Sequence, residues 1–71
     1  MENQENSITL KLEPQNEVRE VARPKTVLQL LNRLGLRHTA CLVIRNATLL
    51  TPDVKIEAGD SIIVRTVTSS G

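Results

Sequence analysis

The densest run of hydrophobic positions lies near the C-terminal end, where Ile62-Ile63-Val64 and Val67 follow the turn residues Ala58-Gly59-Asp60. β-Branched side chains of this kind suit a pleated strand that is packed on both sides. A short apolar run bounded by a glycine-containing turn predicts a strand inside a sheet rather than at its edge. The small residues that follow, Thr68-Ser69-Ser70-Gly71, have little to bury. We therefore expect a flexible tail whose root is fixed by a central strand.

Apolar and polar residues alternate over positions 7–12, which predicts a half-buried strand. The turn residues at 13–16 include a proline, which cannot continue a hydrogen-bonded ladder. Residues 17–22 are expected to return as the second arm of a hairpin. Val18 and Val21 lie three positions apart and cannot share a face of a regular strand, so either a bulge or an edge position is needed there. The apolar residues of the first strand are Ile8, Leu10 and Leu12.

The helix signals begin at Thr26, which is a good N-cap residue, and Gln29 three positions later completes the form of a capping box. Gly35 can adopt the left-handed conformation that ends a helix, and Leu36 can then fold back onto Leu31. A helix of about nine residues is too short to be stable alone, so its apolar stripe must lie on a sheet. The stripe, at spacing i, i+3, i+4 and i+7, consists of Val27, Leu30, Leu31 and Leu34.

A polar joint at 37–39 separates the helix from a second apolar strand, predicted at 40–45. Asn46 is well placed to take a positive φ in a tight turn. Residues 47–50 would then be a short return strand, and 54–57 contribute two more apolar side chains before the final strand.

This order of elements predicts an α+β fold of the β-grasp (ubiquitin-like) type. Its mixed sheet has four to five strands, with one main helix packed across one face. The last strand is expected to be central and parallel to the first, because it pairs most economically there. We expect one domain over 7–67, a disordered N-terminal tail over 1–6 and a flexible C-terminal tail over 68–71.

The composition excludes several classes of protein. Aromatic residues make up 0% of the 71 residues, so leucine, isoleucine and valine must fill the core. No apolar run approaches the ~20 residues that span a bilayer, and the polar, acidic N-terminus does not suit a signal peptide. The single cysteine, Cys41, and the single histidine, His38, rule out an internal disulfide and a Cys/His zinc site. We expect a cytoplasmic chain that binds neither a metal nor a membrane.

No phosphate-binding glycine loop, metal-ligand cluster or catalytic triad is present in the sequence. Cys41 is expected to be a buried structural thiol, and His38 to be a solvated loop residue. The chain is therefore not expected to be an enzyme, and no residue is assigned a catalytic role.

Basic residues dominate the middle of the chain, although the net charge is only +1. Between Arg19 and Arg45 the one acidic residue is Glu20. Such a stretch is either a set of solvated faces or a docking patch for an acidic partner. Nucleic acid is not an expected partner, because the chain has no aromatic side chain on which bases could stack. The candidate docking residues are Arg19, Arg23, Arg37 and Arg45.

In the order and spacing of several segments, the chain resembles the ubiquitin-like sulfur carriers (ThiS/MoaD-like proteins). That family includes the thiamine-biosynthesis carrier ThiS, the small subunit of molybdopterin synthase, and bacterial carriers used in tRNA thiolation. The resemblance covers residues 7–71. The segments that carry it are 26–36 (TVLQLLNRLGL), 43–46 (VIRN), 49–51 (LLT) and 57–63 (EAGDSII), followed by the terminal glycine.

The resemblance implies that Gly71 is the working group. In the family, a partner similar to ubiquitin-activating enzymes joins the C-terminal carboxylate to AMP from ATP, and sulfur then displaces AMP to leave a thiocarboxylate. The carrier itself binds no cofactor, because the partner consumes the ATP. The resemblance also implies a sulfur donor (a persulfide or sulfide) and a downstream sulfur-accepting synthase. Thr68, Ser69 and Ser70 would thread the channel of the adenylating enzyme.

The chain departs from the family at its end, where Ser69-Ser70-Gly71 replaces the usual terminal Gly-Gly. The cognate channel could be wider, the native end could differ, or carrier activity could have been lost. A second function class therefore remains open beside the carrier. This class is a non-covalent β-grasp binding module that uses its sheet or its basic patch.

Overall fold

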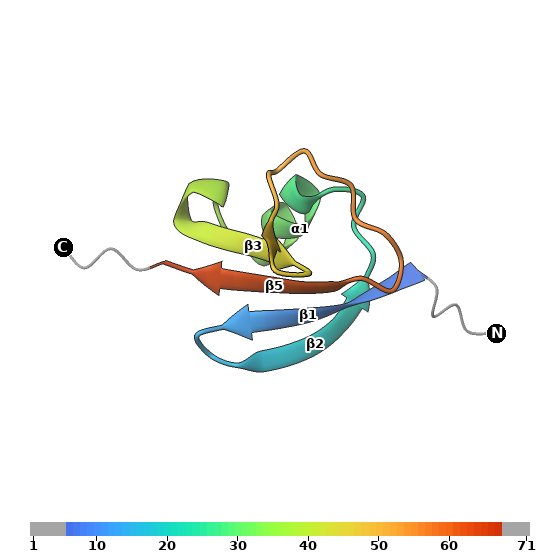
Figure 1. The fold of residues 1–71 in the computed structure, drawn as a ribbon, viewed down its shortest axis with the longest axis horizontal. Helices are drawn as coiled ribbons and strands as arrows, with labels where there is room; N and C mark the ends of the chain where they lie inside the picture. The colour runs from blue at the N-terminus through green and yellow to red at the C-terminus, as the bar shows by residue number, and fades with distance from the viewer. Residues whose placement is uncertain (1–5, 68–71) are drawn as a thin grey trace.

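The computed structural model describes residues 6–67 and forms one mixed five-stranded sheet with a single α-helix. The strand order is β2-β1-β5-β3-β4, so the last strand is central, parallel to β1 and antiparallel to β3. The predicted topology is therefore confirmed (Figure 1). The elements are β1 (Ser7–Glu13), β2 (Glu17–Ala22), α1 (Val27–Leu34), the 3₁₀ helix η2 (His38–Ala40), β3 (Cys41–Arg45), β4 (Thr48–Leu49) and β5 (Ser61–Thr66).

The β1–β2 hairpin has an unbroken register, from Ser7 opposite Ala22 to Leu12 opposite Glu17. No bulge interrupts the hairpin. Val18 and Val21 face opposite sides of β2, and the edge position of this strand explains why one of the two valines can be exposed. Val18 is 63% exposed, whereas Val21 packs against the core. An edge strand needs only weak apolar alternation, because one of its sides faces solvent.

The N-cap at Thr26 and the glycine that ends α1 are confirmed, whereas the predicted capping box forms only in part. The backbone N–H of Gln29 donates to Thr26 Oγ1 at 3.2 Å. The Gln29 side chain accepts from the N–H of Lys25 (2.6 Å), one residue before the donor that a capping box uses. Gly35 has φ 73°, and the N–H of Leu36 donates to the carbonyl of Leu31 at 2.9 Å. These bonds satisfy backbone groups that a short helix would otherwise leave unpaired.

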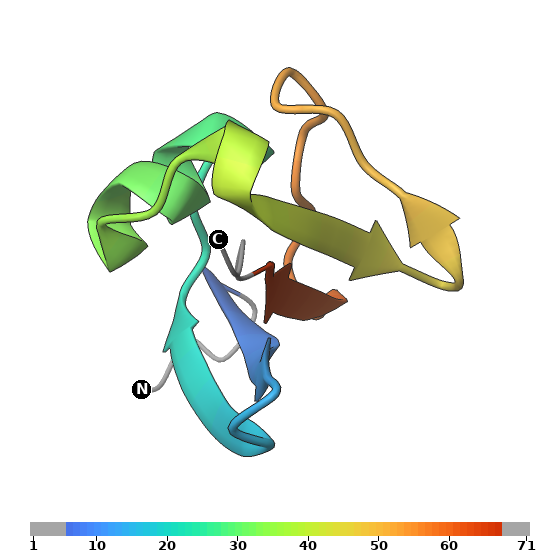
Figure 2. The same ribbon diagram turned by 90° about the vertical axis from the view of Figure 1, so that its left-hand side faces the viewer.

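The core lies between α1 and one face of the sheet, as the edge-on view shows (Figure 2). The opposite face of β5 carries Ile63 and Arg65, and among the described residues no second layer covers it. The expectation that β5 packs on both sides was therefore wrong: it is flanked by strands at both edges but covered on one face. The core residues are Ile8, Leu10, Leu12, Val27, Leu30, Leu31, Cys41, Val43, Ile56, Ile62 and Val64.

The β3–β4 turn places two consecutive residues in the left-handed region, Asn46 at φ 54° and Ala47 at φ 64°. The prediction for Asn46 is confirmed. Ala47, expected to begin the return strand, belongs instead to the turn, and β4 starts at Thr48. Two positive φ values in succession suit a two-residue hairpin loop, because its twist matches that of the strands.

Asn46→Gly is expected to leave the free energy of unfolding unchanged or to raise it, because glycine adopts positive φ without steric cost. Asn46→Val is expected to lower that energy by about 1–2 kcal/mol, because a β-branched residue is strained there. Urea unfolding followed by circular dichroism measures both. Equal stability of the two variants would contradict the turn.

Candidate functional site

The chain leaves the sheet at the end of β5, between two neighbouring strands. Thr66 lies opposite Cys41 of β3, and Arg65 lies beside Glu13 of β1. The N–H of Val67 donates to the carbonyl of Ala40 at 3.0 Å, which extends the ladder by one residue. The root of the predicted tail is thus fixed on both sides. The predicted tail residues Thr68, Ser69, Ser70 and Gly71 lie outside the described residues.

An ion-pair cluster spans β1 and β5 near this root. The Nε and Nη2 atoms of Arg65 donate to Glu13 Oε1 at 3.1 and 2.9 Å, and Lys11 Nζ lies 3.6 Å from Glu13 Oε2. The hydrogen bond from Arg65 is the main reason why the pKa of Glu13 is lowered. This carboxylate therefore stays ionised to a lower pH than an ordinary glutamate, and in that form it links the two parallel strands.

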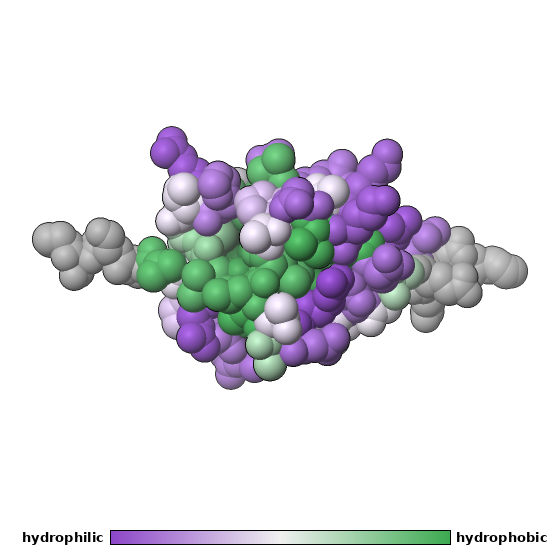
Figure 3. All heavy atoms as spheres, turned by 45° about the horizontal axis from the view of Figure 1, so that its top comes forward, coloured by the Kyte–Doolittle hydropathy of each residue, from purple (hydrophilic) through white to green (hydrophobic). Residues whose placement is uncertain are grey.

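The uncovered face of the sheet carries a set of apolar side chains that we call the apolar band. Cross-strand partners share a face, and the register places Ile44 opposite both Ile63 and Leu49. Leu42 is 40% exposed, Leu49 61% and Val67 54%. The space-filling view shows hydrophobic surface continuing to the C-terminal end of the described chain (Figure 3). The apolar band consists of Leu42, Ile44, Leu49, Ile63 and Val67.

Exposed apolar surface of this kind marks interaction sites more often than chance. The band adjoins the root of the tail, so a partner that covers it would also receive the end of the chain. Sequence reasoning did not assign Leu42 or Leu49 to an exposed surface, although Leu49 belongs to one of the segments that carry the family resemblance. The available signal was the unbroken apolar run Cys41-Leu42-Val43-Ile44, in which alternate residues must face away from the helix.

Cys41 and His38 lie near the root of the tail, on β3 and on η2. The side chain of Cys41 is buried, and its Sγ donates to the carbonyl of Arg37 at 3.2 Å. Burial raises the pKa of this thiol, which keeps it protonated and unreactive. His38 is exposed at the start of η2. Within residues 6–67 no group of three or more His, Cys, Asp or Glu side chains could hold a metal ion.

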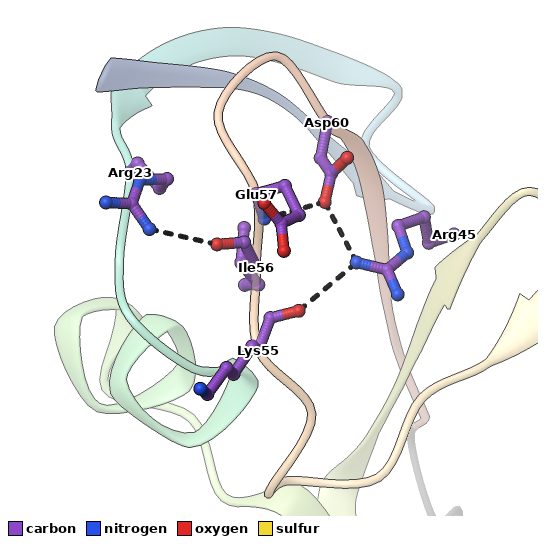
Figure 4. A network of polar contacts seen from close by, with 6 residues as sticks. All are labelled: Arg23, Arg45, Lys55, Ile56, Glu57 and Asp60. Carbon is purple, nitrogen blue, oxygen red and sulfur yellow. Dashed lines mark hydrogen bonds and ion pairs between the residues drawn. The ribbon is translucent and has the colours of Figure 1, made fainter. Parts of the chain in front are cut away.

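Two of the four candidate docking arginines brace the loop that leads into β5 (Figure 4). Arg23 Nη1 donates to the carbonyl of Ile56 at 3.1 Å. Arg45 Nη1 pairs with Asp60 Oδ2 at 2.9 Å and donates to the carbonyl of Lys55 at 3.2 Å. These contacts give both guanidinium groups a structural role, whatever else they bind.

The other two candidates lie elsewhere. Arg19 sits on the edge strand β2 and pairs with Glu17 at 2.9 Å, and two strands separate it from Arg45. Arg37 is exposed just before η2. The structure therefore distributes the four arginines over the domain, and their docking role stays a prediction.

A comparison with protein families gives one match, in which the model of the ThiS family covers residues 8–68. The chain belongs to the ThiS family. Members of this family are small ubiquitin-like sulfur carriers rather than enzymes, and they work with an adenylating enzyme and with enzymes of sulfur pathways. A comparison with curated proteins gives no match.

Among solved structures, the chain is similar to a computationally designed protein based on the template of human erythrocytic ubiquitin, determined by NMR in solution. The TM-score is 0.69 at 22% sequence identity, and the match covers 93% of this chain and 96% of the designed one. This similarity confirms the ubiquitin-like β-grasp fold. Within residues 6–67, none of the helices is of the length and apolarity needed to cross a membrane.

Proposed function

We propose that this ThiS-family chain carries sulfur on Gly71, after a partner enzyme has adenylated the C-terminal carboxylate. The observation that supports the proposal is the placement of the tail root. The central strand β5, flanked by β1 and β3, ends beside the apolar band. A partner that docks on the band would receive residues 68–71 in a defined direction.

The chemistry explains why ATP is needed. A carboxylate is a poor electrophile, because its oxygen is a poor leaving group. Attack of the Gly71 carboxylate on the α-phosphate of ATP forms an acyl-adenylate and releases pyrophosphate. Sulfide adds directly to the carbonyl carbon, and AMP leaves with the bonding electron pair. With a persulfide donor, the terminal sulfur adds in the same way and forms an acyl disulfide. A thiol must then attack the donor's sulfur, which breaks the S–S bond, leaves a disulfide on the donor and releases the sulfur on Gly71. The product is a thiocarboxylate, formed in the cytoplasm, where the partner has ATP.

Glycine suits this position because it presents no Cβ in a narrow channel. Ser70 places a Cβ and a hydroxyl where the family usually has a second glycine, so the proposal requires a partner with room for them. The sulfur acceptor would be a biosynthetic enzyme of the thiamine, molybdopterin or tRNA-thiolation type.

Deleting Gly71 is expected to abolish adenylate formation and to change the free energy of unfolding by less than about 0.5 kcal/mol, the usual range for surface changes. ATP–pyrophosphate exchange with the cognate adenylating enzyme measures the first effect, and urea unfolding measures the second. With a sulfur donor, intact mass should rise by about 16 Da in the full-length chain alone, because sulfur replaces one oxygen.

Ser70→Gly serves as the companion variant, since it restores the family's usual ending without removing the carboxylate. It is expected to exchange at least as fast as the parent chain. Absence of both exchange and the mass shift with a demonstrated native partner would refute the carrier function. The apolar band would then favour the non-covalent binding module.

A further inference from the structure

A basic cleft lies at the end of the molecule opposite the tail root. It forms where the connector between β2 and α1 meets the segment that leads into β5 (Figures 1 and 4). Its volume is about 350 Å³. The lining residues are Arg23, Lys25, Thr26, Lys55, Ile56 and Glu57.

Backbone hydrogen bonds fix the two walls of the basic cleft. The N–H of Ile56 donates to the carbonyl of Lys25 at 3.1 Å, and Thr26 and Lys55 form an antiparallel bridge. Arg23 reaches across and donates to the carbonyl of Ile56. Lys25 and Lys55 are exposed, so rigid backbone presents two ammonium groups to solvent from facing segments.

The charge around the basic cleft is unbalanced. Three cations line it against one carboxylate, that of Glu57. Arg33 supplies a fourth cation beside the basic cleft. Its Nη1 donates to the carbonyl of Ala22 at 3.0 Å, and Ala22 precedes the lining residue Arg23. Within residues 6–67, none of these four cations takes part in an ion pair, although four such pairs exist elsewhere. Clustered like charges create a positive potential that attracts anionic groups.

The neighbouring helix N-terminus contributes little to anion binding, because its donors are already used. The N–H groups of Val27 and Leu28 donate to the carbonyls of Val54 and Pro52. The N–H of Gln29 donates to the Thr26 side chain. An anion in the basic cleft would therefore be bound by lysine and arginine side chains.

We propose that the basic cleft binds the carboxylates of an acidic segment of a partner protein. Binding of duplex DNA rests mainly on many contacts to phosphates, and a protein that makes about 6–10 of them uses more cations than the four gathered here. The chain also has 0% aromatic residues, so single-stranded bases have no stacking platform. A short run of Asp or Glu matches a cleft of this size and charge.

The position of the basic cleft determines what such a partner can do. β5 has six residues and spans about 20 Å at ~3.3 Å per residue, and the basic cleft and the tail root lie at its two ends. A protein bound at the basic cleft leaves the root and the apolar band uncovered. The carrier could thus be held at one end while its tail is modified at the other. This site does not depend on the chemistry proposed for Gly71.

The test is a titration of the ¹⁵N-labelled full-length chain with a hexaglutamate peptide, followed by amide chemical shifts. The largest shifts are expected at residues 23–26 and 55–57, and they should weaken as salt is raised. The double charge reversal Lys25→Glu with Lys55→Glu is expected to weaken binding at least about tenfold, because each lost attraction becomes a repulsion. The control is Gln15→Glu with Thr39→Glu, which adds two negative charges at exposed positions outside the basic cleft and should change affinity less than about twofold.

Three results would overturn the proposal. The peptide could shift amides away from the basic cleft, the control variant could weaken binding as much as the charge reversal does, or a ten-nucleotide oligouridylate could bind more tightly than the peptide at the same salt concentration. The double variant Lys25→Gln with Lys55→Gln tests the same site in case the charge-reversed variant misfolds. It removes both charges with less disturbance, and it should still lose most of the affinity while keeping the parent spectrum.

Discussion

Replacing Leu31 with alanine is expected to lower the free energy of unfolding by ~2–5 kcal/mol, the cost of removing a buried leucine side chain. Leu31 is 1% exposed and lies between α1 and the sheet. A domain of 71 residues has a total stability of roughly 4–11 kcal/mol at the usual value per residue. One truncation could therefore remove a large share of it.

Leu28→Ala is the matched control, because it makes the same chemical change in the same helix at a side chain that is 44% exposed. Its cost should stay below about 1 kcal/mol, since little buried surface is lost and alanine favours the helix. Urea unfolding of both variants gives the comparison. A cost below about half a kcal/mol for Leu31→Ala would mean that the helix is packed through another face.

Replacing Leu49 with aspartate is expected to lower kcat/KM for adenylation of the carrier at least ~30-fold, because interface hot spots contribute about 2 kcal/mol or more. Leu49 is 61% exposed on the apolar band, and docking would desolvate the introduced charge. The fold should tolerate the change, since the side chain already faces solvent. The assay is ATP–pyrophosphate exchange with carrier concentration varied.

Val18→Asp provides the control for that experiment. Val18 is 63% exposed, almost the same as Leu49, but it lies on the edge strand β2 at the far side of the sheet. It should leave kcat/KM within about threefold of the parent, as expected for a residue outside the interface. Equal losses at the two positions would argue against docking on the apolar band.

The helix was predictable because its signals are local. The N-cap at Thr26, the apolar stripe and the glycine that ends the helix all lie within ten residues, and each has a direct physical meaning. The central position of β5 was also predictable, since the short apolar run Ile62-Ile63-Val64, bounded by a glycine-containing turn, indicates a strand inside a sheet.

The exposure of Leu42 and Leu49 was not predictable in the same way. Alternation along one strand shows that two faces exist, and only the register with β5 and the position of α1 show which face stays open. Lys25 and Lys55 illustrate the same limit. They are 30 residues apart in sequence, and the bridge between Thr26 and Lys55 that joins their segments depends on the whole fold.

The parallel pairing of β1 with β5 has a consequence for the order of synthesis. A hydrogen bond joins Arg65 to Glu13, which is 52 residues earlier in the sequence. The β1–β2 hairpin can therefore pair with the rest of the sheet only after β5 has been synthesised. During translation, β1 and β3 would expose unpaired edges until β5 emerges from the ribosome, and such edges are prone to pair with other chains. A nascent chain that stalled before β5 would keep these edges and part of the core exposed, and chaperones and proteases recognise surface of that kind. Only chains that have been synthesised through β5 can therefore complete the sheet and hold the root of the tail in place.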